Sequence, residues 1–208
     1  MQVPSEITPE YGGRPADCPP PNPRLAAWWR ELNRVGADFN GFDLTLETTH
    51  HGPWIETPSM FIEIGSTAAT WGHKRAAELL AGIIFRGLGL DGGEGLGEWD
   101  GTGQVVVTLG GGHYAPRANM LGMHSHVWIG HMLATYALPF ERDESGKISG
   151  MWENSIRKAI DATKKGFPGG EIVCSMDKKA FKGWQRQAIR DLLEELGIPL
   201  LKSAQIIG

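Results

Sequence analysis

The sequence predicts an α/β protein with a single domain, in which helices flank a mixed central sheet. Three observations support this prediction. Short apolar runs rich in β-branched residues alternate along the chain with segments whose apolar residues recur at helical spacing. A length of 208 residues suits one hydrophobic core. The proline-rich residues 1–23 indicate an irregular N-terminal arm, so we expect the α/β domain over residues 24–208.

In the first half of the chain, two helices and two strands are expected. Apolar residues at helical spacing predict a helix over 24–35. Alternation of apolar and polar residues predicts a half-buried strand over 42–47, and an apolar run predicts a second strand over 60–64. Thr67 is a favourable N-cap, so a helix is expected to begin there and to continue to about Ile84.

In the second half, strands and helices alternate after a glycine-rich loop. The abundance of glycine and acidic residues over 87–103 predicts that loop, and the β-branched run at 104–109 predicts a strand. The same patterns predict a helix near 128–136, a helix around 156–160, a strand over 171–176, a helix over 179–196 and an edge strand over 198–201.

Composition narrows the class of protein further. No apolar stretch approaches the ~18 residues that a membrane span needs, and the polar, proline-rich N-terminus does not resemble a signal peptide. The two cysteines, Cys18 and Cys174, lie far apart in the chain, which favours reduced thiols over a disulfide. We therefore expect a cytoplasmic protein that does not bind membranes.

The charge is unevenly distributed along the chain. The net charge of −4 argues against general affinity for nucleic acids, but residues 157–190 carry +6 whereas residues 1–156 carry −8. A basic segment inside an acidic protein suits a local phosphate-binding patch. A solvated helical face gives the same pattern, so the charge alone does not decide between the two.

Three polar clusters follow predicted strands. Gly110–Tyr114 contains three glycines, which let the backbone approach a ligand closely, and a histidine, a residue type that binds protons, metals and phosphates. Thr48–Pro53 and Glu63–Thr67 follow two earlier strands. Ligands of α/β sheets bind at the carboxyl ends of the strands, so we expect the three clusters to form one site.

The side chains of these clusters suit water-mediated hydrolysis. A neutral histidine such as His50, His51 or His113 takes a proton from water that attacks an ester, or ligates zinc. Glu63 lies in an apolar run, where a carboxylate is costly unless it is paired, and the Gly65–Thr67 turn offers hydroxyls and N–H groups to an anion. Each feature has a structural alternative, because histidines also serve in cores, Glu63 can face solvent and the turn can simply cap a helix. No GxSxG, HExxH or catalytic-cysteine signature is present, which argues against covalent catalysis.

Taken together, the motifs resemble the archaeal and plant type of D-aminoacyl-tRNA deacylase. The resemblance runs from about Gly12 to the C terminus. Family members usually have a further N-terminal segment with a first strand, so we expect a shortened member whose sheet lacks that strand. The matching segments, in the family's order, are Thr48–Pro53, Phe61–Thr67 with Trp71, Gly110–Arg117, Gly130–Met132 followed by Tyr136–Leu138, and Asp177–Lys179.

The resemblance implies hydrolysis of the ester that joins a D-amino acid to the terminal ribose of tRNA. It also implies a cytoplasmic, monomeric enzyme with zinc as cofactor and aminoacylated tRNA as partner. The catalytic candidates carried over by motif are His50, His51, Glu63, His113 and His131, and the candidate zinc ligands are His50, His51 and His113. The candidates for binding substrate or tRNA are Ser66, Thr67, Gly111, Gly112, Tyr114, Lys164, Lys178, Lys179 and Arg186.

Two other functions remain open at this point. One is a zinc-dependent hydrolase of small amides or peptides that uses the same histidines. The other is a non-catalytic remnant that binds tRNA, which the shortened N-terminal region favours. The motifs also leave open which histidine activates water.

Overall fold

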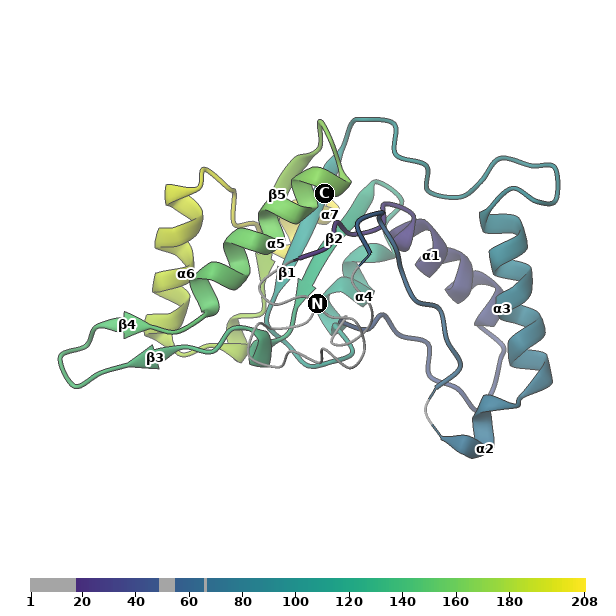
Figure 1. Cartoon of the computed structure of the whole chain (residues 1–208), viewed down its shortest axis with the longest axis horizontal. Helices are drawn as coiled ribbons and strands as arrows, with labels where there is room; N and C mark the ends of the chain where they lie inside the picture. Colours follow the sequence, from purple (N-terminus) through teal and green to yellow (C-terminus); the bar gives the residue numbers. More distant parts are fainter. Residues whose placement is uncertain (1–17, 49–54, 66) are drawn as a thin grey trace.

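The computed structural model of the chain, which describes residues 18–48, 55–65 and 67–208, has a sheet of three parallel strands at its centre (Figure 1). β1 is the middle strand, and Val105, Val106 and Val107 on it are fully buried. Burial of consecutive residues is expected for a parallel strand that is covered on both faces. The strands are β1 (Gln104–Leu109), β2 (Val127–Leu133) and β5 (Glu171–Met176), in the order β2-β1-β5.

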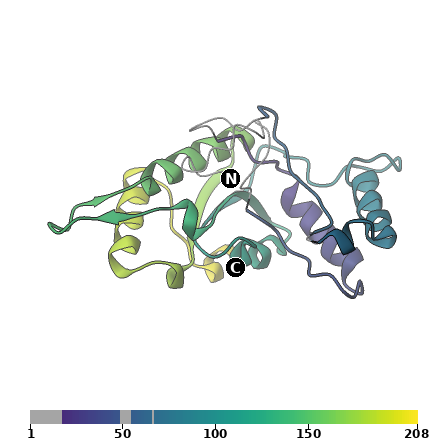
Figure 2. The same ribbon diagram turned by 60° about the horizontal axis from the view of Figure 1, so that its bottom comes forward.

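Helices cover both faces of this sheet. Val105 and Val107 pack in one core with side chains of α5 and α6, whereas Val106 packs in another with α1, α4 and α7. Successive side chains of a strand point to opposite faces, which explains this division. Figure 2 shows α5 (green) and α4 (teal) on opposite sides of the strands. These helices are α1 (Leu25–Gly36), α4 (Pro116–Gly122), α5 (Trp152–Gly166), α6 (Gly183–Glu195) and α7 (Ser203–Ile207).

A short antiparallel hairpin projects from this body (Figure 1). It pairs β3 (Glu141–Arg142) with β4 (Ile148–Ser149). At its base, the Phe140 ring stacks on Trp152 with ring centroids 4.6 Å apart. The predicted α/β class is confirmed. The antiparallel pairing lies in this separate hairpin, whereas the central sheet is parallel.

The region between α1 and β1 is less regular. It contains α2 (Ala68–Trp71) and α3 (Lys74–Gly87). α3 packs on α1, and a Cβ at Gly87 would lie 2.5 Å from the Trp28 ring. The helix predicted after Thr67 is therefore two helices. The second has its own N-cap, since the His73 ring accepts a hydrogen bond from the N–H of Ala76.

The strands predicted over 42–47 and 60–64 are wrong, because these segments have no regular secondary structure and neither belongs to a sheet within the described ranges. A single bridge joins Pro21 to Ser59. An alternating sequence predicts the extended conformation, whereas a strand also needs a neighbour with which to pair. Residues 1–17 of the predicted arm lie outside the described residues.

In the second half, the strands at 104–109 and 171–176 are confirmed. The helix predicted near 128–136 is wrong, because that segment is β2 followed by η2 (Thr135–Ala137), a single 3₁₀ turn. A continuous apolar run does not distinguish a buried strand from a buried helix.

The last predicted elements are confirmed only in part. The helix over 179–196 is preceded by another 3₁₀ turn, η3 (Lys178–Ala180), before α6 begins. The edge strand over 198–201 is a single bridge from Leu200 to Cys174. Within the part of the chain that the structure describes, no helix is long and apolar enough to cross a membrane.

Candidate active site

The carboxyl ends of the three parallel strands meet at one edge of the sheet. The loop Gly110–Ala115 follows β1, η2 follows β2, and η3 follows β5. In open α/β sheets this edge is where ligands bind. The structure therefore places the GGGHY motif where the sequence predicts it, with two further turns beside it.

The loop after β1 has a backbone that requires glycine. Gly110 and Gly111 have φ angles of 87° and 90°, which L side chains rarely adopt. A Cβ at Gly110 would also lie 2.6 Å from the Phe181 ring. Hydrogen bonds tie the loop to the end of β2: the N–H of Gly110 donates to Leu133 O (2.7 Å), and the N–H of Thr135 donates to Gly111 O (3.0 Å). The loop is thus held on the rigid sheet.

His113 lies between a carboxylate and a phenol. Its Nε2 contacts the carboxylate of Glu47, and its Nδ1 lies 3.2 Å from the Tyr136 hydroxyl. The Tyr136 hydroxyl is also 3.1 Å from Thr48 Oγ1. The main chain of Thr48 docks on the same loop, because its N–H donates to His113 O at 2.9 Å. About a third of the His113 and Glu47 side chains is exposed (31% and 35%), so a substrate can reach the pair.

These contacts indicate which ring nitrogen of His113 carries the proton. An ionised carboxylate only accepts hydrogen bonds, so Nε2 of His113 carries the proton that faces Glu47. Nδ1 then carries the lone pair and accepts the Tyr136 O–H. A histidine oriented in this way by a carboxylate is suited to act as a general base.

The structure places the other predicted residues as follows. Glu63 is exposed, and the carboxylate that contacts His113 belongs to Glu47 instead. Thr67 is exposed at the start of α2. Gly111, Gly112 and Tyr114 lie in the His113 loop, whereas His50, His51 and Ser66 lie outside the described residues.

His131 is on β2 and is 9% exposed. Its Nε2 lies 2.9 Å from Pro19 O and 3.2 Å from Cys18 Sγ. Burial lowers the pKa of its imidazole to about 3, so the ring is neutral at physiological pH and Nε2 donates to the carbonyl. These contacts make His131 an anchor for the chain at residues 18–19.

The predicted basic patch is divided between two ends of the sheet. Lys164 is in the last turn of α5, which leads into the amino end of β5, whereas Lys178 and Lys179 follow its carboxyl end. Six residues of strand separate the two ends by about 20 Å. Lys178 and Lys179 are exposed near the His113 edge. Arg186 supports their turn, since its Nη1 donates to the main-chain carbonyls of Lys178 (3.1 Å) and Phe181 (2.6 Å).

The described residues do not by themselves form a metal site. Among them, no three histidine, cysteine, aspartate or glutamate residues lie close enough to hold a metal ion. His113 and Glu47 are two potential ligands, whereas a catalytic zinc takes three from the protein. The candidate ligands His50 and His51 are not described, so we derive no chemical step through zinc.

Glu47 and Tyr136 are not among the site residues predicted from the sequence, and Thr48 is predicted only as part of the Thr48–Pro53 cluster. Glu47 and Thr48 end the alternating segment just before the histidine pair, which is a signal that could have identified them. Tyr136 follows the end of β2, but the apolar pattern of its segment predicts a helix, and this hides its position at the edge of the sheet.

Comparison with known proteins agrees with the motifs. A family model described as D-aminoacyl-tRNA deacylase matches residues 5–201. The chain belongs to the D-aminoacyl-tRNA deacylase family. It is 42% identical over 205 residues to a D-aminoacyl-tRNA deacylase of Arabidopsis thaliana, with 92% of this chain and 64% of the plant protein covered. It is 35% identical over 173 residues to one of Pyrococcus abyssi, with 83% and 54% covered.

A solved structure has the same fold. It is the crystal structure of a conserved protein of unknown function, with a TM-score of 0.71 and 27% sequence identity. The match covers 95% of this chain and 62% of that chain. This family member therefore spans less than two thirds of the length of each of the three relatives.

Proposed function

We propose that the protein hydrolyses the ester that joins a D-amino acid to the terminal ribose of tRNA. The observation that carries the proposal is the array of Glu47, His113 and Tyr136 at the strand-end edge of a member of the D-aminoacyl-tRNA deacylase family. Such an array supplies a general base for water, and hydrolysis of an activated ester needs little more.

The reaction begins with proton transfer toward His113. The Tyr136 hydroxyl is hydrogen-bonded to Nδ1 of His113, so water reaches this nitrogen through the phenol. The attacking water gives a proton to the phenol oxygen, and the phenol proton passes to Nδ1. The hydroxide oxygen adds to the ester carbonyl carbon, and the Glu47 carboxylate stabilises the imidazolium that forms. The bond from the carbonyl carbon to the ribose oxygen then breaks, and the proton returns along the same path to that oxygen. The products are a free D-amino acid and an unesterified tRNA.

The same loop offers a donor for the charge that develops on the carbonyl oxygen. The N–H of Gly110 donates to Leu133 O, and the N–H of Gly111 donates to Thr135 Oγ1. Gly112 is exposed, and its N–H has no acceptor within the described part of the chain. A preorganised backbone donor of this kind stabilises an oxyanion.

The partner of this site is aminoacylated tRNA. Lys178 and Lys179, exposed at the same edge, suit the RNA backbone, which proteins contact through its phosphates. A monomeric protein in the cytoplasm and a bound zinc ion, both expected from the sequence, remain parts of the proposal.

Ester loss from D-tyrosyl-tRNA and L-tyrosyl-tRNA tests the proposal. We expect faster loss of the D form with the protein than with buffer, and a rate about 10²- to 10⁴-fold lower for His113→Asn. His126→Asn is the matched control, because that ring bonds Ile206 O near the amino end of β2. Equal loss of the D form with protein and with buffer would refute the proposal.

Two further arms separate the alternatives. A chelator that abolishes turnover would assign a required metal. Turnover of small amides without any effect of tRNA would indicate the zinc hydrolase, and tRNA binding without ester loss would indicate the non-catalytic remnant.

A further inference from the structure

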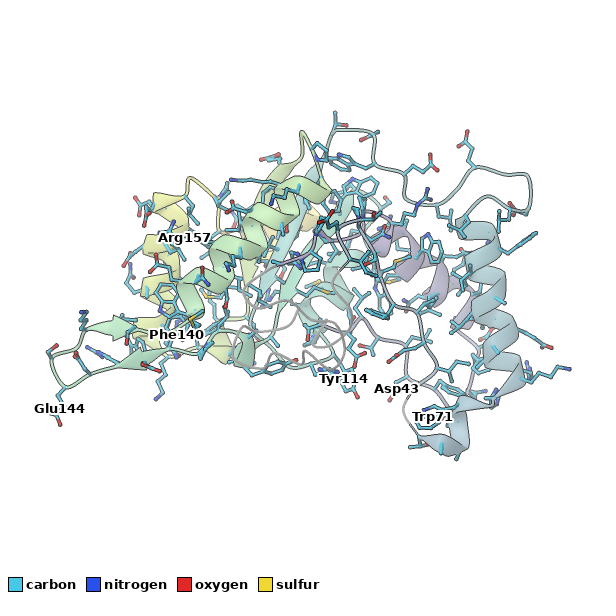
Figure 3. The ribbon with its side chains drawn as sticks, in the orientation of Figure 1. Asp43, Trp71, Tyr114, Phe140, Glu144 and Arg157 are labelled. Carbon is cyan, nitrogen blue, oxygen red and sulfur yellow. The ribbon has the colours of Figure 1, made fainter. Side chains whose placement is uncertain are left out.

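We propose that Tyr114 is the platform on which the 3′-terminal base of the RNA stacks. This inference rests on the proposed function and adds a binding site for an adenine base to it. Tyr114 directly follows His113 and is 56% exposed. The centroids of the two rings are 5.1 Å apart with an interplanar angle of 77°. Figure 3 shows Tyr114 at the lower edge of the molecule.

The backbone that carries this ring is fixed. The carbonyl of Tyr114 accepts hydrogen bonds from Thr45 Oγ1 and Asn119 Nδ2, both at 3.0 Å. The next residue, Ala115, has a φ of 40° and donates its N–H to Gly112 O at 3.1 Å. A ring presented by an ordered backbone loses little conformational entropy when a ligand binds to it.

The position of Tyr114 matches the chemistry of the substrate. The ester and the terminal base are attached to the same ribose. A platform for the base must therefore lie no further from the catalytic histidine than one ribose ring allows. Proteins hold unpaired RNA ends by stacking their bases on aromatic side chains. Tyr136 is also half exposed, but its hydroxyl bonds to His113 and Thr48. The Tyr114 hydroxyl makes no hydrogen bond within residues 18–48, 55–65 and 67–208, which leaves its ring available.

A pair of model esters tests the proposal without the rest of the tRNA. One is the D-tyrosyl ester of adenosine, and the other is the D-tyrosyl ester of glycerol, which has no base. Tyr114→Leu is expected to lower kcat/KM for the adenosine ester about 5- to 150-fold, the range that corresponds to loss of an aromatic ring on which one base stacks. It should leave the glycerol ester within about twofold, and Tyr114→Phe should leave both unchanged. Phe85→Leu, which removes another exposed aromatic ring (51%) from α3, is the matched control and should leave both esters unchanged.

The outcomes separate this proposal from the proposed function. If the wild-type protein hydrolyses both esters and Tyr114→Leu slows both equally, or neither, Tyr114 does not bind the base. If the wild-type protein hydrolyses D-tyrosyl-tRNA but neither model ester, the reaction needs the rest of the tRNA, and if it does not hydrolyse D-tyrosyl-tRNA either, the proposed function fails. In both cases binding of the trinucleotide CpCpA decides whether Tyr114 holds the base. Weaker binding of CpCpA by Tyr114→Leu, with binding of the same oligonucleotide abasic at its 3′ end unchanged, supports the platform. An equal effect on both, or no effect, overturns it.

Discussion

The two halves of the molecule use their apolar side chains differently. In the sheet half, residues 104–208, the strands lie between helices, and Val106 and Ile129 are fully buried. In the other half, large apolar side chains are exposed, and Phe61 (61%) and Leu90 (60%) are examples. In the sheet half, two of the most exposed aromatic rings are Tyr114 and Tyr136, which lie at the candidate site.

The difference arises from backbone pairing. Each central strand shares a hydrogen-bonded ladder with its neighbour, whereas the segments 42–48 and 55–65 belong to no sheet in the described structure. Separate hydrogen bonds hold the first of these instead, since Asn119 Oδ1 accepts the N–H of Leu46 at 2.7 Å and the N–H of Thr48 donates to His113 O at 2.9 Å. The candidate site joins the two halves, because His113 and Tyr136 follow strands of the sheet and Glu47 belongs to the irregular segment.

The largest effect we expect is on the free energy of unfolding, when a large apolar side chain is truncated in the sheet half rather than in the other half. Ile129→Ala removes a fully buried side chain of β2 and should lower the free energy of unfolding by about 2–5 kcal/mol. Phe61→Ala, at an exposed position, should change it by no more than about 0.5 kcal/mol. Urea denaturation measures both. A decrease for Phe61→Ala as large as that for Ile129→Ala would show that Phe61 is covered in solution.

The hydrogen bonds of Asn119, which connect the two halves, are the next point to test. Asn119 Nδ2 donates to Thr45 Oγ1 and Tyr114 O, both at 3.0 Å. Asn119→Ala would leave the buried N–H of Leu46 without its acceptor and should cost about 1–3 kcal/mol of stability. Hydrolysis of D-tyrosyl-tRNA should also fall, because Glu47 loses its support.

Asn33→Ala is the matched control for Asn119→Ala, since Asn33 Nδ2 bonds the Trp29 carbonyl in its own helix. Equal stability and equal activity of the two variants would mean that the hydrogen bonds of Asn119 do not hold Glu47 in place.

The sequence predicts the sheet half better than the other half. The runs at 104–109 and 171–176 are short, contain β-branched residues and are bounded by polar or glycine residues, which favours a strand over a buried helix. His113 is predictable because it directly follows such a strand. The segments 42–47 and 60–64 carry the same local signal, but pairing depends on distant residues that local patterns do not encode.

The partners of His113 depend on the same non-local information. Both Glu47 and Glu63 lie in segments whose apolar residues predict strands, and the sequence does not determine which carboxylate reaches the histidine. Lys164 and Lys178 belong to one basic segment in the sequence, but β5 runs between them and carries them to opposite ends of the sheet. Proximity in the chain is therefore a poor guide to a shared surface.

A second contact between the halves, between His131 and Pro19, predicts that stability depends on pH. The pKa of His131 is about 3 in the folded protein because the ring is buried, against about 6.5 in an unfolded chain. Below about pH 6.5 the unfolded chain binds a proton that the folded protein does not, so stability falls as the pH falls. Between pH 7 and pH 5 this histidine alone should remove about 2 kcal/mol.

His131→Gln keeps an N–H donor for Pro19 O and removes the titrating group. The difference in unfolding free energy between wild type and variant should therefore shift by about 2 kcal/mol in favour of the variant from pH 7 to pH 5. A difference that stays constant with pH would show that the His131 ring is accessible to protons in the folded state.

The smallest effect we expect is on tRNA binding, and it should differ between the two ends of the sheet. Replacing Lys178 and Lys179 together by alanine should weaken tRNA binding and lower the slope of log K against log salt by about 0.7–0.9 for each phosphate that the variant no longer neutralises. Replacing Lys164 and Lys165, in the last turn of α5, removes the same charge at the far end and should leave the slope unchanged. Filter binding at several salt concentrations measures both. If the two double variants lower the slope equally, the RNA contacts both ends of β5 or is attracted only by net charge, and the strand-end edge is not its specific binding surface.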